Sequence, residues 1–270
     1  MLRTSGEHAV RLKDRVAIVT GAGSGIGRAI ADRFAAEGAV AVIADVNVEA
    51  IEKAVAEIRA AGGRAVGRRV DVTRRDEVAA AMADIARTEG RIDILVNNAG
   101  ITRYRAFEEL DDADWDAVLG LDLKAVFHCA QAVAPYMVAR RYGKIVNISS
   151  SLGTGTSPHV GDLSPGCSAA YASAKAAVIQ LTKTLARELG PSQVNVNAVA
   201  PGFFLTPLTG KTRTPEQVKD HIEYRTSLAV LKRAGKLEEL ASVVLFLASD
   251  ESSFISGHTI PVDGGRTDRM

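Results

Sequence analysis

A tyrosine and a lysine four residues apart form the most chemically suggestive pair in the sequence. Tyr171 and Lys175 lie near the start of a long helical stretch, and their i, i+4 spacing places both side chains on one helix face. A free tyrosine has a pKa near 10, which is too high for an efficient base at neutral pH. A nearby ammonium favours the phenolate, by up to about 4 kcal/mol at 4 Å and an effective dielectric of 20. The pair therefore predicts a tyrosine general acid/base that needs no metal.

A glycine-rich turn near the start of the sequence is the second candidate site. It reads Thr20-Gly21-Ala22-Gly23-Ser24-Gly25-Ile26-Gly27, between an apolar run and a helical stretch. Glycines allow a tight turn, and the following helix start offers free N–H groups to a pyrophosphate. The spacing is not the strict G-x-G-x-x-G, and no Walker-type Gly-Lys-Ser/Thr follows. A plain structural turn is the alternative, but the place after the first strand favours dinucleotide binding.

Asp45 ends the next apolar run, at about the distance of roughly 20 residues where dinucleotide-binding folds have an acid. An acid there accepts hydrogen bonds from the adenosine ribose and repels a 2′-phosphate. Position 46 is valine rather than a cation, although Arg28 could partly relieve the repulsion. The alternative is that Asp45 only caps the helix beginning near Val48. We expect NAD, in preference to NADP.

Short strands alternating with helices would position these residues. Val- and Ile-rich runs predict about seven strands, apolar almost throughout as in a parallel sheet covered on both faces, at 16–20, 40–45, 65–70, 92–97, 144–149, 194–199 and 258–262. Helical patterns cover 25–37, 48–61, 76–89, 112–140, 169–189 and 237–248. Glycines are expected to end helices at 38, 62, 90, 143 and 190. The fold class is α/β: a doubly wound, Rossmann-type parallel sheet flanked by helices.

The whole chain, 1–270, is expected to be one dinucleotide-binding domain with an N-terminal extension over 1–11. Segments 151–168 and 201–236 break the strand–helix rhythm, although a short helix is expected near 214–225. Both follow strand ends, where open α/β sheets bind ligands, so we predict that they are substrate-side loops.

Composition excludes several classes of protein. The formal net charge is +1, with 47% hydrophobic residues, which argues against disorder, nucleic-acid partners and an anionic membrane. Cys129 and Cys167 cannot form a disulfide framework, and no Cys/His spacing predicts a metal site. No run approaches the ~18 apolar residues of a membrane span, and no signal peptide is expected. A soluble cytoplasmic protein is the default.

Together the motifs resemble those of the short-chain dehydrogenase/reductases. The glycine turn, Asn97-Asn98-Ala99-Gly100, Ile148-Ser149-Ser150, Tyr171-x-x-x-Lys175 and Pro201-Gly202 occur in that family's order, and the resemblance extends from about Leu12 to Gly265. It implies an oxidoreductase that acts on CH–OH groups with NAD(P). It also implies a homotetramer built on long helices and the last strand.

The resemblance implies a role for each matching residue. Tyr171 matches the general acid/base, and Lys175 matches the residue that holds the nicotinamide ribose and lowers the tyrosine pKa. Ser150 matches the serine that hydrogen-bonds the substrate oxygen, although Ser149 and Ser151 leave an offset by one open. Asn97 is expected mainly to brace the sheet. The other implied cofactor contacts are Gly21, Ser24, Gly25, Ile26, Gly27, Asp45, Asp71, Val72, Asn98, Ala99, Gly100, Pro201, Gly202 and Thr206.

The sequence departs from the family at Asp122, where the family usually has Asn. The backbone carbonyl of that Asn links the lysine to solvent through a water, a role that Asp122 could preserve, so we include it among the catalytic residues. A carboxylate near Lys175 could instead weaken the lysine's effect on Tyr171, or be protonated or satisfied locally.

The gap between Ser150 and Tyr171 is also longer than the family's usual spacing. The extra residues are either a tolerated surface insertion or part of the substrate pocket. In the second case His159 and Asp162 would be polar contacts, although we leave His159 out of the predicted site.

The sequence thus predicts an NAD(H)-dependent oxidoreductase that interconverts a secondary alcohol and a ketone. One alternative is an NADPH-dependent 3-oxoacyl thioester reductase. The other is a non-catalytic dinucleotide-sensing protein, against which the complete Ser150, Tyr171 and Lys175 set argues. The insertion before Tyr171 favours a polar substrate of unknown identity.

Overall fold

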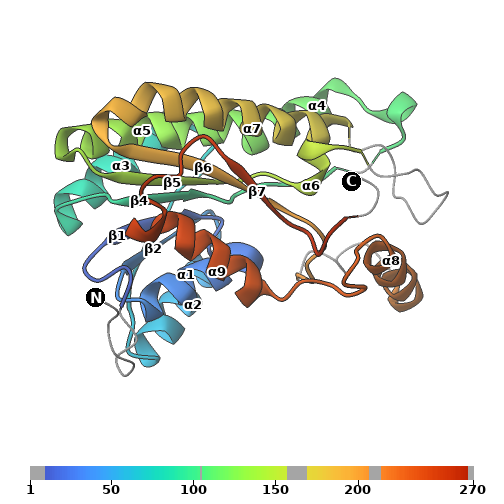
Figure 1. The fold of residues 1–270 in the computed structure, drawn as a ribbon, viewed down its shortest axis with the longest axis horizontal. Helices are drawn as coiled ribbons and strands as arrows, with labels where there is room; N and C mark the ends of the chain where they lie inside the picture. Colours follow the sequence, from blue (N-terminus) through green and yellow to red (C-terminus); the bar gives the residue numbers. More distant parts are fainter. Residues whose placement is uncertain (1–9, 104, 157–168, 207–213, 267–270) are drawn as a thin grey trace.

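The computed structural model describes residues 10–103, 105–156, 169–206 and 214–266. Its centre is one seven-stranded parallel sheet with the strand order β3-β2-β1-β4-β5-β6-β7 (Figure 1). The strands are β1 Val16–Thr20, β2 Val40–Asp45, β3 Arg64–Arg69, β4 Ile94–Asn97, β5 Gly143–Ile148, β6 Val194–Pro201 and β7 Thr259–Val262. The predicted α/β fold, a doubly wound Rossmann-type sheet, is confirmed.

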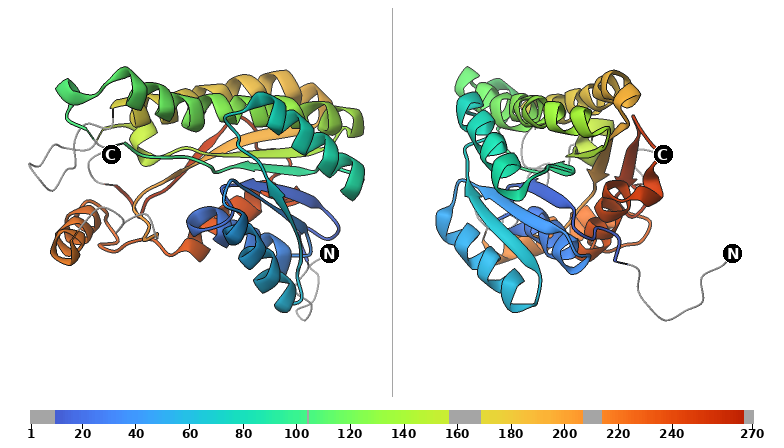
Figure 2. Two further views of the ribbon diagram at one scale, coloured as in Figure 1. Left: turned by 180° about the vertical axis from the view of Figure 1, so that it is seen from behind. Right: turned by 90° about the vertical axis from the view of Figure 1, so that its left-hand side faces the viewer.

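Helices cover both faces of the sheet (Figures 1 and 2). One layer consists of α1 Gly25–Ala36, α2 Val48–Ala60 and α9 Leu237–Ala248. The other consists of α3 Arg75–Glu89, α4 Asp112–Leu119, α5 Ala125–Arg140 and α7 Ala169–Leu189. The two-sided cover explains why the strands are apolar almost throughout, because neither face of the sheet meets water.

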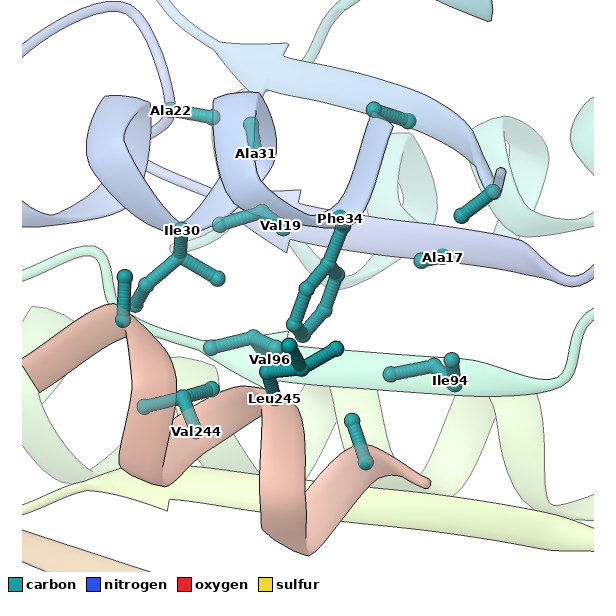
Figure 3. Packing of buried hydrophobic residues seen from close by; sticks show 14 of the residues in the cluster. Ala17, Val19, Ala22, Ile30, Ala31, Phe34, Ile94, Val96, Val244 and Leu245 are labelled. Atoms are coloured by element: carbon teal, nitrogen blue, oxygen red, sulfur yellow. The ribbon is translucent and has the colours of Figure 1, made fainter. Parts of the chain in front are cut away.

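Each face of the sheet has its own aliphatic core. In β1, Ala17 and Val19 belong to the core beneath α1 and α9, while Val16 and Ile18 belong to the core on the opposite face. Figure 3 shows the first core, where Phe34 of α1 and Leu245 of α9 meet Val96 of β4. This packing fixes the strand ends that carry the polar residues of the site.

The order of the strands creates a crevice at the carboxyl ends of the central strands. β1 pairs with β2 on one side and with β4 on the other, so the connections reverse direction at β1. Ligands bind in open α/β sheets at such a reversal, beyond the carboxyl ends of the strands. Four polar or glycine positions lie at these carboxyl ends, each at the end of a strand or directly after it: Gly21, Asp45, Asn98 and Ser149.

The predicted helix over 112–140 is interrupted. A π-helical turn, Gly120–Lys124, separates α4 from α5. The interruption places Asp122 at 0% exposure in the interior of the protein. Sequence periodicity alone could not reveal it, because one extra residue in a turn leaves both flanking helical patterns intact.

The same stretch, Asp112–Arg140, is long and apolar enough to cross a membrane by length and composition, so the expectation that no run approaches such a span is wrong. Its partners show another role. α5 packs against α3, α7, β4 and β5, and its buried side chains, including Val133 and Met137, belong to the core. It is a core helix of the fold.

Two of the predicted helix-ending glycines are wrong. Gly38, Gly62 and Gly90 do have positive φ angles after helices, but Gly143 begins β5 and Arg141 takes the left-handed position instead. Gly143 is required for another reason, since a Cβ there would lie 2.7 Å from Cγ of Met137. Gly190 begins a short 3₁₀ helix, Gly190–Ser192.

The irregular segments contain two further helices. α6 Ser151–Thr154 was not predicted, whereas α8 Pro215–Ser227 confirms the short helix expected near 214–225. The predicted pocket role of His159 and Asp162, together with Cys167, lies outside the described residues.

Candidate active site

A cleft of about 630 Å³ opens at the carboxyl ends of the strands. Every residue predicted to bind cofactor or catalyse lines it, with the exception of Gly27. The cleft therefore brings together motifs that are spread from Gly21 to Thr206 in the sequence.

The glycine turn is joined to the Asn98 segment by hydrogen bonds. Thr20 Oγ1 accepts from the backbone N–H groups of Asn98 at 3.0 Å and Ala99 at 3.1 Å, and Asn98 Nδ2 donates to Thr20 O at 2.9 Å. Gly21 and Gly25 have φ angles of 65° and 56°. These bonds fix the glycine turn against the Asn98 segment.

Gly27 does not line the cleft, but it packs closely against the glycine turn. A Cβ at position 27 would collide with the carbonyl oxygen of Gly21 and would lie 2.5 Å from Asn98 Nδ2. The start of α1 can therefore approach β1 only because residue 27 has no side chain. This close approach, with the helix start facing the cleft, fits a dinucleotide pyrophosphate.

Asp45 is held by the backbone of the glycine turn. Its Oδ2 accepts from Gly23 N at 2.9 Å, and its Oδ1 accepts from Asn47 N at 3.0 Å. The helix-capping alternative is wrong, because Asn47 is the N-cap of α2 and accepts from Ala50 N. Asp45 lines the cleft instead.

The cations near Asp45 and Asp71 are engaged by acids. Arg28 pairs with Asp32 and Glu57, both at 2.7 Å, so it is not directed at Asp45 as the sequence allowed. Arg69 and Arg74 both pair with Glu77. No described ion pair therefore neutralises the carboxylate of Asp45.

Asp71 and Val72 line the same end of the cleft, after β3. Hydrogen bonds from the Thr73 hydroxyl, at 2.6 Å, and the Thr73 N–H lower the pKa of Asp71. Its carboxylate is therefore charged and fixed at neutral pH.

The three consecutive serines after β5 have different surroundings. Ser149 is buried and its hydroxyl donates to the carbonyl of Lys175 at 2.8 Å. Ser149 and Ser150 both line the cleft, but the Ser150 hydroxyl is not used as a donor to the backbone of α7, and its Oγ accepts from Leu152 N at 3.1 Å as the N-cap of α6. Ser151 is buried and does not line the cleft. These positions favour Ser150 as the serine that faces a substrate.

Tyr171 and Lys175 lie on α7 and both line the cleft. Lys175 is 3% exposed, and its Nζ donates to the carbonyl of Ile148 at 3.1 Å. The ammonium lies 5.5 Å from the centre of the Tyr171 ring. The pair is thus placed as the spacing predicted, with the cation close enough to act on the phenol.

Asp122 contacts Lys175 directly. Its Oδ1 lies 2.9 Å from Lys175 Nζ, and its Oδ2 accepts from Ile101 N at 3.0 Å. Burial raises the pKa of Asp122, and the attraction of Lys175 opposes that rise. A side chain at Gly100 would collide with Asp122 Oδ1. The carboxylate therefore lies in direct contact with Lys175 and with the backbone of Ile101.

Asn97 braces the sheet. Its Nδ2 donates to Asn147 Oδ1 at 2.9 Å, and Asn147 Nδ2 donates to Thr182 Oγ1 at 2.9 Å. This buried chain joins β4, β5 and α7, so it fixes the distance between the sheet and the helix that carries Tyr171.

Sequence reasoning missed three cleft residues near α8. Phe203 follows Pro201-Gly202, and His221 and Arg225 project from α8 into the same cleft. The capping sequence Thr214-Pro215-Glu216-Gln217 was a usable signal for the helix, since the capping box is formed. It does not reveal which face of the helix meets the cleft.

Comparisons with known proteins assign the family. Residues 21–267 match the family described as enoyl-(acyl carrier protein) reductase. A solved structure of a short-chain type dehydrogenase/reductase from Mycobacterium marinum superposes with a TM-score of 0.86 at 34% identity, over 96% of this chain and 98% of that one. The chain is a short-chain dehydrogenase/reductase. As a member of this family, it is an enzyme that acts on CH–OH groups with NAD(P).

Relatives of this short-chain dehydrogenase/reductase carry different substrate names. The 3-oxoacyl-[acyl-carrier-protein] reductase FabG of Thermotoga maritima is 43% identical over 256 residues, covering 95% of this chain and 99% of its own. Meso-2,3-butanediol dehydrogenase of Serratia marcescens is 38% identical over 258 residues, covering 96% of each chain. Family membership therefore fixes the reaction class but not the substrate.

Proposed function

We propose that this enzyme is an NAD(H)-dependent oxidoreductase that interconverts a secondary alcohol and a ketone, with Tyr171 as general acid/base. The observation that carries the proposal is the common cleft in which Tyr171, Lys175 and Ser150 meet the glycine turn and Asp45. The described residues fit a dinucleotide that extends from Asp45 and Asp71 to the catalytic side chains.

Bound NAD would accept or return the hydride, and residues of the protein would take up and return the proton. In alcohol oxidation, Tyr171 Oη takes the hydroxyl proton, and in ketone reduction it returns that proton. Ser150 Oγ hydrogen-bonds the substrate oxygen and so holds it beside Tyr171. Lys175 favours the phenolate through its positive charge. Asp122 positions Lys175, with which it forms a buried ion pair.

The proposed cofactor contacts divide along the cleft. Gly21, Ser24, Gly25 and Ile26 would hold the pyrophosphate, and Asp45 would accept from the adenosine ribose hydroxyls. The adenine would lie near Asp71 and Val72, and the nicotinamide amide near Pro201, Gly202 and Thr206. The engaged Arg28 and the fixed carboxylate of Asp45 support NAD in preference to NADP.

The second candidate is a 3-oxoacyl thioester reductase that uses NADPH. The 43% identity to the Thermotoga reductase favours it. The carboxylate of Asp45 opposes it, because a 2′-phosphate would meet an uncompensated like charge. Two comparisons of kcat/KM separate the candidates: NAD⁺ against NADP⁺ with an alcohol panel, and NADH against NADPH with an acetoacetyl thioester.

Tyr171→Phe tests the catalytic proposal. Loss of the phenolic proton should lower kcat by about 100- to 10,000-fold, the range of general acid–base catalysis. NADH binding, measured by its fluorescence, should stay within a few-fold of the wild-type enzyme. Tyr136→Phe, on α5 and outside the cleft, is the matched control and should retain full turnover. Normal turnover of Tyr171→Phe would exclude the mechanism.

A homotetramer is part of the proposal. Apolar side chains on α5 are solvent-exposed in the single chain, with Phe127 39% and Val138 38% exposed. Burying them between copies would use the long helices, as the family resemblance implies. Light scattering after size exclusion tests this, and a monomer would refute it.

A further inference from the structure

The cleft carries different charges along its length. Among its described lining residues, those with a formal charge are Asp45, Asp71, Asp122, Lys175 and Arg225. Asp45 and Asp71 follow β2 and β3, and Asp122 and Lys175 pair with each other. Arg225 on α8 is therefore the lining cation outside the catalytic pair.

Arg225 and His221 are held on one aromatic ring. They are four residues apart on α8, so they share a helix face. The Arg225 guanidinium carbon lies 5.6 Å from the centre of the Phe203 ring. The His221 ring packs edge-on against Phe203, with 5.5 Å between ring centres and an interplanar angle of 84°. Phe203 thus places a guanidinium and an imidazole together at the β6 end of the cleft.

This arrangement leaves the guanidinium suited to an anion. The Arg225 guanidinium lies over the Phe203 ring, and the fork geometry of a guanidinium matches the two oxygens of a carboxylate. The nearest charges along the cleft do not oppose an anion, because the charge of Asp122 is balanced by Lys175 at 2.9 Å. The acids Asp45 and Asp71 lie at the opposite end of the cleft, after β2 and β3.

We propose that the substrate is a hydroxy acid or oxo acid whose carboxylate is bound by Arg225, with His221 beside it. The inference rests on the proposed function, since the reacting oxygen is taken to lie between Ser150 and Tyr171. Two other roles for Arg225 are possible outcomes of the test. It could bind a cofactor phosphate, or it could only fasten α8 to Phe203.

The experiment compares acids with their methyl esters in the same enzyme. The probes are 3-oxobutanoate, 4-oxopentanoate and 5-oxohexanoate, each with its methyl ester. They differ in the number of carbons between ketone and carboxylate, and the acid whose length spans from Tyr171 to Arg225 should be preferred. Binding to the NADH-loaded enzyme is measured by the change in NADH fluorescence, and kcat/KM by NADH absorbance. Two variants are compared. Arg225→Met retains an apolar stem against Phe203, and Arg225→Lys keeps the positive charge but lacks the paired N–H donors of a guanidinium. Lys219→Met removes an exposed charge from the same helix and is the matched control.

We expect at least one acid to bind and react better than its ester, and Arg225→Met to reduce this preference by about 10- to 100-fold. Arg225→Lys should lose part of the preference, and Lys219→Met should keep it within twofold. Ester kinetics and NADH affinity should hardly change. If Arg225→Met does not fold, the partial loss in Arg225→Lys still tests the proposal.

Three results would overturn the inference. The first is that no acid is preferred to its ester, or that neither binds. The second is that the preference survives in Arg225→Met. The third is a loss of NADH affinity that affects acids and esters equally, which would assign Arg225 to a cofactor phosphate. Preferred binding of an acid without turnover of any probe would contradict the proposed function while supporting the carboxylate site.

Discussion

The ammonium of Lys175 lies 2.9 Å from the carboxylate of Asp122, with both side chains almost wholly buried. The same lysine lies 5.5 Å from the centre of the Tyr171 ring. Asp122 and Tyr171 therefore both interact with the same positive charge. An ionised Asp122 weakens the stabilisation that Lys175 gives to a Tyr171 phenolate.

Replacing Asp122 with Asn should shift the pH dependence of alcohol oxidation to lower pH. An ionised Asp122 disfavours the Tyr171 phenolate, so its removal lets the phenolate form at a lower pH. Asn keeps an oxygen that can accept from Ile101 N, so the fold should be retained. The measurement is kcat/KM against pH, in which the rising limb should move. Asp116→Asn, an exposed acid on α4, should leave the limb in place. An unmoved limb in Asp122→Asn would show that Asp122 is already protonated in the working enzyme.

Asp45→Asn should weaken the preference for NADH over NADPH. The substitution keeps an oxygen for Gly23 N but removes the charge that repels a 2′-phosphate. The ratio of kcat/KM values should change by about 10- to 100-fold, since about 1.4 kcal/mol corresponds to tenfold. Glu49→Gln, an exposed acid at the start of α2, should not change the ratio. An equal loss with both cofactors would mean that Asp45 only supports the glycine turn.

Gly27→Ala should destabilise the protein by about 1–3 kcal/mol, the usual cost of overpacking. The added methyl would meet the carbonyl of Gly21 and the Asn98 amide, so the turn must shift. Denaturant unfolding and NADH binding should both record the change. Gly190→Ala has no atom within 4 Å of the added methyl and should unfold like the wild-type protein. Wild-type stability in Gly27→Ala would refute the close approach of α1 to the turn.

Cys129 should resist thiol reagents in the native protein. It lies on α5 at 1% exposure, and burial raises the pKa of its thiol to about 12. The thiolate is the reactive form, so labelling at pH 8 should require unfolding. In a Cys167→Ser background, the label should enter rapidly only in guanidinium chloride. Fast labelling without denaturant would show that α5 opens readily.

The fold was largely predictable because its main signals are local. Val- and Ile-rich runs between helical patterns indicated a covered parallel sheet, and all seven strands lie within two residues of their predicted ends. The errors occur where tertiary packing overrides local signals. Gly143 packs against Met137 rather than ending a helix, and the π-turn at Gly120–Lys124 carries a buried carboxylate that contacts Lys175 on α7.

The site was predictable only where a motif describes it. The cleft gathers Ser150, Tyr171 and Lys175 as the motifs indicated. The family resemblance brought Asp122 near Lys175, but no local pattern could show that its carboxylate contacts the ammonium directly, because that contact joins the π-turn to α7 across 53 positions of chain. The contact between the Phe203 ring and Arg225 likewise joins the segment after β6 to α8 across 22 positions of chain, which no local pattern records.

The π-turn between α4 and α5 also predicts how the protein would respond to the deletion of a single residue. It can be described as a one-residue insertion into an otherwise regular helix. Deleting one residue within 120–124 would restore the regular helix, because the wide turn that absorbs the extra residue would no longer be needed. Such a deletion would improve the helix and misplace Asp122, so a protein selected for stability alone would tend to lose this residue. Its presence marks a place where backbone regularity is given up to keep a buried charge beside Lys175.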